Sequence, residues 1–277
     1  MDKGLFLIGL YLLFSFFSIG ISSKFKIPVL LLFLLLGILS GSEGIGGLYF
    51  DDNNLTYFIS TLALSVILFT GALETKVSTI KSVLVPSASL ATFGIVITTF
   101  LTGITAKIFL DFSYPEAFLF GAAVSSTDAA SVFSTLKSTK VKIDTKVRSI
   151  LEVESGSNDP MAYGLIVLFA SLIKSQNISG AGIFGSIFSF FGQVVIGALL
   201  GFLIGFVISF GLKKYKVKNL EAIVILLLST LFLSFSIPEN LGGNGFLAIY
   251  ITGLVISNTT FELKKTATYF FGVFSWI

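Results

Sequence analysis

The stretch LEVESGSNDPMAYGLIVLFASLI, residues 151–173, places three acids directly before a run as apolar as a membrane span. Glu152, Glu154 and Asp159 all lie within its first nine residues. A charged side chain at the centre of a bilayer costs at least about 2.5 kcal/mol, so an acid inside a span is a functional candidate by default. Whether these acids lie in a membrane depends on the rest of the chain.

The composition is that of an integral membrane protein. Of the 277 residues 54% are hydrophobic and only 12% are charged, and the mean hydropathy is +0.97. A soluble domain of this length could not bury so much apolar surface. Cysteine and histidine are both absent, which excludes disulfides, thiolate chemistry, His-based zinc sites and imidazole proton relays. Titration near neutral pH would therefore involve carboxylates or lysines with shifted pKa values.

Hydrophobic runs of about 20 residues predict roughly ten transmembrane spans. They cover residues 4–22, 28–47, 54–72, 83–110, 115–136, 150–173, 183–212, 220–237 and 241–257, and the last begins near Thr266. Fifteen of the 18 basic residues fall in the odd-numbered connections between these spans. The positive-inside rule then places those connections in the cytoplasm and the N-terminus outside.

The fifth predicted span is interrupted by four consecutive polar residues. It reads FGAAVSSTDAASVF over residues 120–133, with Ser125, Ser126, Thr127 and Asp128 in the middle. These residue types compete for backbone hydrogen bonds and favour helix N-caps. The pattern predicts a broken helix, with Thr127 or Asp128 capping a half-helix that begins near Ala129. The alternative is a polar seam that hydrogen-bonds to a neighbouring helix.

In the sixth predicted span the polar residues divide between two faces of a helix. Ser155 and Asp159 are four residues apart and share one face, and Glu152 falls near it. Glu154 and Asn158, also four apart, share a different face. Asp159 lies roughly two turns deeper than Glu152, so we expect Asp159 to be inside the membrane.

Gly156 and Pro160 soften this helix beside the acids. Pro160 has no N–H to donate to the carbonyl of Gly156, which leaves an oxygen free near Asp159. Carboxylates, hydroxyls and free carbonyls suit a hard cation that prefers oxygen ligands. The span therefore predicts a cation site.

A purely structural role remains open for two of the acids. Glu152 and Glu154 could lie at the cytoplasmic mouth and pair with Lys146 or Arg148.

The sequence resembles the NhaP-type monovalent cation:proton antiporters of bacteria over essentially its whole length. The motifs that carry the resemblance are SSTDAASVFSTL (125–136) and LEVESGSNDPMA (151–162). IPVLLLFLLLGILSGSEGIGG (27–47) and LGGNGFLAIYITGLVISN (241–258) also look like the branch called cell-volume-regulation protein A, which is described as potassium/proton antiporters.

The resemblance implies roles for the polar residues. Asp159 would bind either K⁺ or Na⁺ or a proton, and Thr127, Glu154 and Ser155 would help to coordinate the ion. Asp128 and Asn158 would tie the sixth span to the unwound fifth. Relatives with two adjacent aspartates are electrogenic, so Asn158 implies electroneutral exchange of one cation for one proton. The remaining site-organising residues would be Ser126, Gly156 and Pro160.

The resemblance also implies an all-α membrane domain of the sodium/hydrogen exchanger type, with inverted repeats and crossed broken helices. Residues 1–173 would form a first repeat of six spans, 183–212 a linking span and 220–277 the start of a second repeat. The family has about thirteen spans, so the chain looks truncated. The second broken helix is missing, and so is the arginine expected to pair with Glu154. A homodimer in the cell membrane is implied for the full-length protein, with no cofactor and no nucleic acid.

The physics of a buried carboxylate gives the same mechanism. Burial raises a carboxyl pKa, so near neutral pH such a group can trade its proton for a cation, and competition for one site couples the two. Three alternatives remain: an intramembrane aspartyl enzyme that uses Asp128 and Asp159 as an acid–base dyad, a passive cation channel, and an inactive part of an antiporter.

Overall fold

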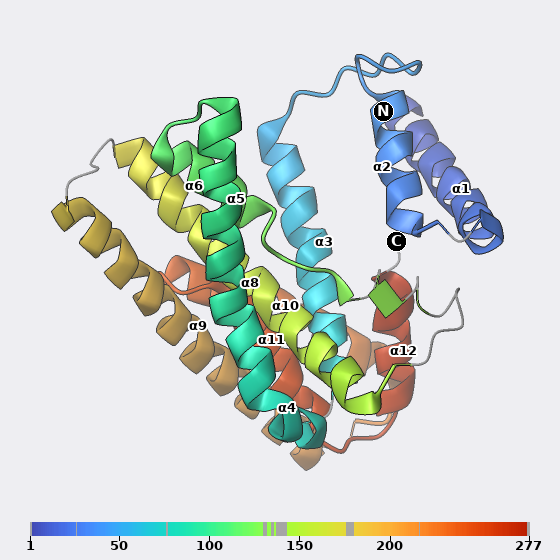
Figure 1. Ribbon diagram of the computed structural model, residues 1–277. Coiled ribbons are helices and arrows are strands. Elements are labelled where there is room, and N and C mark those ends of the chain that lie inside the picture. The colour runs from blue at the N-terminus through green and yellow to red at the C-terminus, as the bar shows by residue number, and fades with distance from the viewer. Residues whose placement is uncertain are drawn as a thin grey trace. The chain divides into compact units, whose positions relative to one another are not determined.

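In the computed structural model, all the named secondary-structure elements of the described residues are helices (Figure 1). The described residues are 2–25, 27–75, 77–129, 132–133, 136, 143–175, 180–215 and 217–275. The chain divides into two compact units. One holds Met1–Ser60 and Asp128–Asp144, and the other holds Thr61–Thr127 and Thr145–Trp276.

The first unit contains α1 (Asp2–Phe25), α2 (Val29–Ser40) and the beginning of α3 (Asn53–Glu74). Helix α2 is only 12 residues long, so the span expected over residues 28–47 is wrong in its second half. The reason is a glycine-rich turn after Ser40. A Cβ on Gly44 would lie 2.3 Å from the carbonyl oxygen of Ile38, and Gly47 has a φ of +57°. Only glycine fits such a close approach and such a backbone angle.

The second unit contains the remainder of α3 and the helices on either side of residues 128–144. These are α4 (Val77–Ser89), the π-helical turn η1 (Leu90–Gly94), α5 (Ile95–Leu110), α6 (Tyr114–Ala123), α8 (Thr145–Ser175), α9 (Gly180–Tyr215), α10 (Leu220–Asn240), α11 (Gly245–Ser257) and α12 (Lys264–Phe274). The expected spans 83–110, 183–212 and 220–237 lie within α4–η1–α5, α9 and α10.

Five helical segments of the described chain are long and apolar enough to cross a membrane. They are Leu5–Ser22, Asn53–Glu74, Ile80–Leu110, Gly180–Tyr215 and Leu220–Asn240. Fewer segments qualify than the ten predicted because several expected spans are short or polar. Helices α2 and α11 are apolar but short, α6 ends at the polar break, and α8 carries its acids.

The largest core of the second unit lies where α3, α10, α11 and α12 meet. Phe69, Leu231, Ile249 and Phe271 are fully buried there, and the rings of Phe69 and Phe271 meet edge to face. Aromatic rings and branched aliphatic side chains fill such a core at the density of a crystal.

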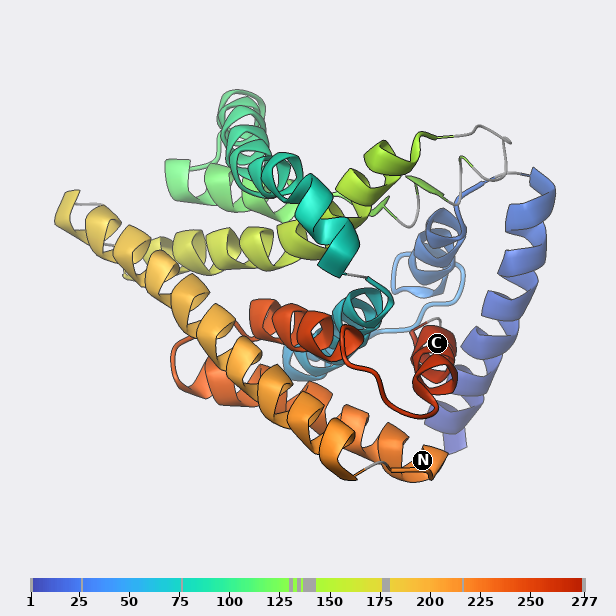
Figure 2. The same cartoon turned by 90° about the horizontal axis from the view of Figure 1, so that it is seen from below.

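Helix α11 lies directly against α9 along a stripe of glycines (Figure 2). A Cβ on Gly197 would lie 2.5 Å from the Asn244 carbonyl oxygen, and one on Gly201 would lie 2.5 Å from that of Ala248. A Cβ on Gly205 would lie 2.9 Å from the side chain of Val255. Small residues at four-residue spacing let two membrane helices approach closely, and these three glycines do so here.

Helix α6 is held between α5 and α8 (Figure 1). A Cβ on Gly121 would lie 2.3 Å from the carbonyl oxygen of Thr99, so α6 touches the backbone of α5. At its start, Ser113 and Glu116 form a capping box. These contacts fix where α6 ends, and therefore where the polar residues after it lie.

Candidate functional site

The polar residues after α6 leave the helix. Residues 125–128 have no regular structure between the end of α6 at Ala123 and the helical residue Ala129. The Ser125 hydroxyl donates to the Ala122 carbonyl 2.8 Å away, which turns the chain out of the helix. In the first unit, the Val132 N–H donates to the Asp128 carbonyl, as expected where a helical turn starts. The predicted break in the fifth span is confirmed.

Helix α8 continues through its proline. It runs for 31 residues, from Thr145 to Ser175, with Pro160 inside it. A proline within a helix removes one backbone hydrogen bond without ending the helix when neighbouring groups compensate. The acids of the sixth predicted span are therefore carried on one continuous helix.

The Asn158 side chain joins the two segments. It is fully buried, and its Nδ2 donates to the carbonyl and hydroxyl oxygens of Thr127 at 3.2 and 2.7 Å. The same nitrogen lies 2.9 Å from Oε1 of Glu154. Since an amide nitrogen carries two hydrogens, these three acceptors share them.

Glu154 is occupied by the unwound segment. Its side chain is only 7% exposed, and the Thr127 hydroxyl lies 3.0 and 3.2 Å from its two oxygens. Within the described chain no lysine or arginine forms an ion pair with Glu154. Its carboxyl group accepts hydrogen bonds from two uncharged side chains, Thr127 and Asn158.

Asp159 lies on the neighbouring face of α8, next to the same segment. It is partly buried, and the Ser126 hydroxyl donates to its Oδ1. One turn earlier on α8, the Ser155 hydroxyl donates to the Thr127 carbonyl oxygen at 3.1 Å. The C-terminal end of α6 adds partial negative charge here, which favours a cation.

Of the residues predicted for the site, the structure brings together Ser126, Thr127, Glu154, Ser155, Asn158 and Asp159. Asp128 belongs to the first unit, and its expected role in tying the two spans stays a prediction. The coordinating roles given to the others also stay predictions.

Gly156 and Pro160 both contact α11. A Cβ on Gly156 would lie 2.4 Å from the ring of Tyr250, and the Pro160 carbonyl accepts from Nδ2 of Asn244 at 2.8 Å. Asn244 is buried, and its Oδ1 also caps α11 through the N–H of Leu247. Sequence reasoning missed Asn244 and Tyr250. The position of Asn244 directly before an apolar run, a common N-cap pattern, was the available indication.

Glu152 lies at the surface, apart from this cluster. Its Oε1 is 2.8 Å from Nε of Arg148, one turn earlier on α8, and both side chains are well exposed. For Glu152 the structure therefore shows the alternative of a surface ion pair with Arg148. Glu154 forms no such surface pair in the described chain, because its side chain is buried against Thr127.

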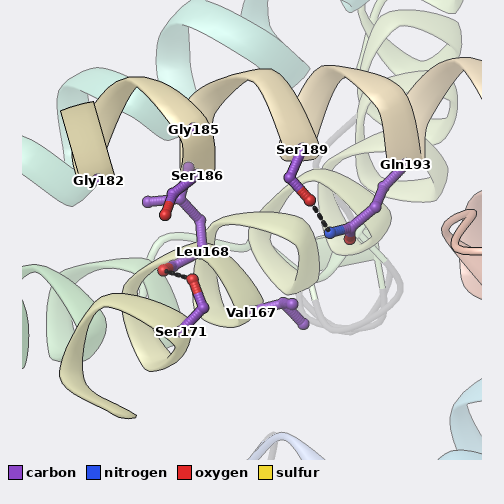
Figure 3. Close-up of a pocket in the computed structure, with 8 residues that line it drawn as sticks. All are labelled: Val167, Leu168, Ser171, Gly182, Gly185, Ser186, Ser189 and Gln193. Atoms are coloured by element: carbon purple, nitrogen blue, oxygen red, sulfur yellow. Dashed lines mark hydrogen bonds between the residues drawn. The ribbon is translucent and has the colours of Figure 1, made fainter. Parts of the chain in front are cut away.

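A separate pocket of about 360 Å³ lies between α8 and α9 (Figure 3). Val167 and Ser171 line it from α8, and Ser186 and Gln193 from α9. Val167 is eight residues beyond Asp159, about 12 Å along the helix. None of the six clustered residues lines it, so it is distinct from the candidate site.

The fold and the polar break inside it define a class: multi-pass membrane proteins with an unwound segment beside acids on a neighbouring helix, an arrangement known from secondary transporters. Residues 11–277 match the family model described as "Sodium/hydrogen exchanger, transmembrane". The chain belongs to this family. Since the family consists of exchangers, the match sets aside the alternative of an intramembrane aspartyl enzyme.

Individual relatives agree with the family. The chain is 39% identical over 261 residues to the K(+)/H(+) antiporter NhaP2 of Shewanella sp. (strain MR-4), covering 88% of this chain and 44% of that protein. It is 33% identical over 251 residues to the K(+)/H(+) antiporter NhaP of Alkalimonas amylolytica, covering 91% and 43%. The Na(+)/H(+) antiporter NhaS2 of Synechocystis sp. (strain ATCC 27184 / PCC 6803 / Kazusa) is 28% identical over 205 residues, covering 74% and 36%. The chain spans less than half the length of these relatives.

A solved structure shares the fold. The sodium proton antiporter MjNhaP1 from Methanocaldococcus jannaschii superposes with a TM-score of 0.82 at 23% identity, covering 99% of this chain and 66% of that one. The expectation of an antiporter-type helical fold is confirmed.

Proposed function

We propose that the protein exchanges a monovalent cation for a proton across the cell membrane, with Asp159 as the site that both ligands share. The observation that carries this proposal is the pairing of a partly buried Asp159 with an unwound segment that ends a membrane helix. Unwound backbone at membrane depth is tolerated only where it is buried in protein or lines a cavity, and such segments form the ion sites of secondary transporters.

The hydrogen bonds support different roles for the two acids. Both oxygens of Glu154 meet the Thr127 hydroxyl, so Glu154 holds the unwound segment to α8. Asp159 accepts a hydrogen bond from the Ser126 hydroxyl, and its carboxylate is the group that we assign to bind either a cation or a proton. We assign Ser155 and Thr127 as additional oxygen ligands, because both belong to the same hydrogen-bonded cluster.

Competition at one carboxylate makes the exchange one for one. Asp159 is neutralised either by a proton or by a monovalent cation, so the net charge of the occupied site is the same in both directions. The adjacent Asn158 is neutral and adds no charge to the cycle. This supports electroneutral exchange.

Potassium is the first cation to test. The relatives that are 33 and 39% identical are named as K⁺/H⁺ antiporters, whereas the one named for Na⁺ is 28% identical. Oxygen ligands alone accept both ions, so the test includes both. A homodimer in the lipid bilayer is part of the same proposal.

The experiment uses proteoliposomes that contain a pH dye. K⁺ or Na⁺ is added outside, and internal pH is followed for this chain, for a version extended to the length of its relatives, and for Asp159→Asn. We expect cation-driven proton efflux that Asp159→Asn abolishes. Cation flux without proton movement would favour a passive channel. Activity only in the extended version would identify this chain as an inactive part of an antiporter.

A further inference from the structure

Helix α11 contacts α8 on both sides of Asp159 along the chain. The Asn244 amide donates to the Pro160 carbonyl, one residue after Asp159, and the Tyr250 ring lies against Gly156, three residues before it. The turn of α8 that carries Asp159 is therefore held by the unwound segment on one face and by α11 on another.

The Tyr250 hydroxyl is buried beside the side chain of Ser157, and it makes no hydrogen bond of regular geometry with any described residue. The residue is only 5% exposed, and its hydroxyl oxygen would lie 2.8 Å from a Cβ on Gly156. The end of the phenol therefore rests on the backbone of α8. A ring that only filled space would need no hydroxyl here, because an unpaired buried hydroxyl is unfavourable.

The part of α8 under this hydroxyl has acceptors to spare. Pro160 has no N–H, so the Gly156 carbonyl has no helical donor. The adjacent Ser157 donates its hydroxyl hydrogen to the Val153 carbonyl, 2.9 Å away, and its oxygen is the side-chain acceptor beside the Tyr250 hydroxyl. A hydroxyl without a regular hydrogen bond thus faces a turn with a hydroxyl oxygen and a carbonyl oxygen that can accept one.

We propose that Tyr250 is a positioning residue for the shared site, and this inference rests on the proposed function. Its hydroxyl donates to the Gly156–Ser157 turn when α8 shifts during transport, and this sets the position of Asp159 one turn away. A hydrogen bond that forms in only one of two states shifts the balance between them. Its loss changes apparent cation affinity and the pH profile more than it changes folding.

Tyr250→Phe tests this inference, because it removes only the hydroxyl. The matched control is Thr252→Val, which removes another buried hydroxyl from the same helix. Thr252 faces α9, where it donates to the Gly201 carbonyl at 2.9 Å. Both variants are compared with the parent in the extended chain, by exchange in proteoliposomes and by thermal unfolding in detergent.

We expect Tyr250→Phe to change the apparent KM for K⁺ by roughly threefold to tenfold, the effect of one hydrogen bond, and to shift the pH profile with little change in Tm. Thr252→Val should lower Tm and leave KM and the pH profile unchanged. An unchanged KM in Tyr250→Phe, or an equal shift in Thr252→Val, would overturn the inference. A parent without cation-driven proton movement would contradict the proposed function itself, and the inference would fall with it.

Discussion

At the scale of single residues, Asn158 holds more of the site together than either acid. Its nitrogen serves oxygens of Thr127 and Glu154, and no part of the side chain is exposed. An aspartate at this position has no donor and adds a negative charge beside Glu154. We therefore predict that Asn158→Asp lowers the free energy of unfolding by about 3 kcal/mol, measured by chemical denaturation in detergent.

Asn240→Asp is the control for this substitution. Asn240 is exposed and donates to a single carbonyl, that of Ser236, at 2.7 Å. A surface change of this kind should alter stability by no more than about 0.5 kcal/mol. Equal losses in the two variants would mean that the bonds of Asn158 do not hold the unwound segment in place.

Glu152 and Asp159 are acids of the same helix with opposite expectations. Glu152 pairs at the surface with Arg148, and exposed pairs of this kind contribute at most about 1 kcal/mol. Glu152→Gln should leave the rate of cation-driven proton efflux within about twofold of the parent, whereas Asp159→Asn should abolish it. A Glu152→Gln variant that expresses normally but shows no cation-driven proton efflux would mean that the Glu152 carboxylate takes part in transport.

At the scale of helices, α9 and α11 approach too closely for any side chain at Gly201. The added methyl of Gly201→Ala would meet the backbone of Ala248, which cannot rotate away. We predict a loss of about 2 kcal/mol in unfolding free energy. Gly211→Ala lies on the same helix with nothing within 4 Å of the added carbon, and should stabilise the protein by up to about 1 kcal/mol. Equal effects would show that α11 can move away from α9.

The features that the sequence predicted at this scale are local ones. Four polar residues in a row after Val124 predict a broken helix, and glycines at 197, 201 and 205 predict a close helix contact, because both patterns act through the backbone at the same place. The contacts of Asn244 and Tyr250 with α8 were missed. They join residues 84 and 94 positions apart along the chain, and their pairing depends on tertiary packing.

At the scale of the whole molecule, the orientation in the membrane depends on the uneven placement of lysine. In the second unit, the last turn of α9 and the connection after it carry Lys213, Lys214 and Lys218, whereas the connection around Asp111 has only Lys107 nearby. The positive-inside rule places the first in the cytoplasm and the second outside.

The absence of native cysteine makes this orientation directly measurable. Asp111 and Lys214 are both exposed, so a single cysteine at either position should react with a maleimide. We predict that a membrane-impermeant maleimide labels Asp111→Cys in intact cells and labels Lys214→Cys only after the membrane is opened. A denatured sample of each variant, fully labelled, is the control for thiol reactivity. Labelling in the reverse order would mean that the protein has the opposite orientation in the membrane, and that the two sides of the proposed exchange are interchanged.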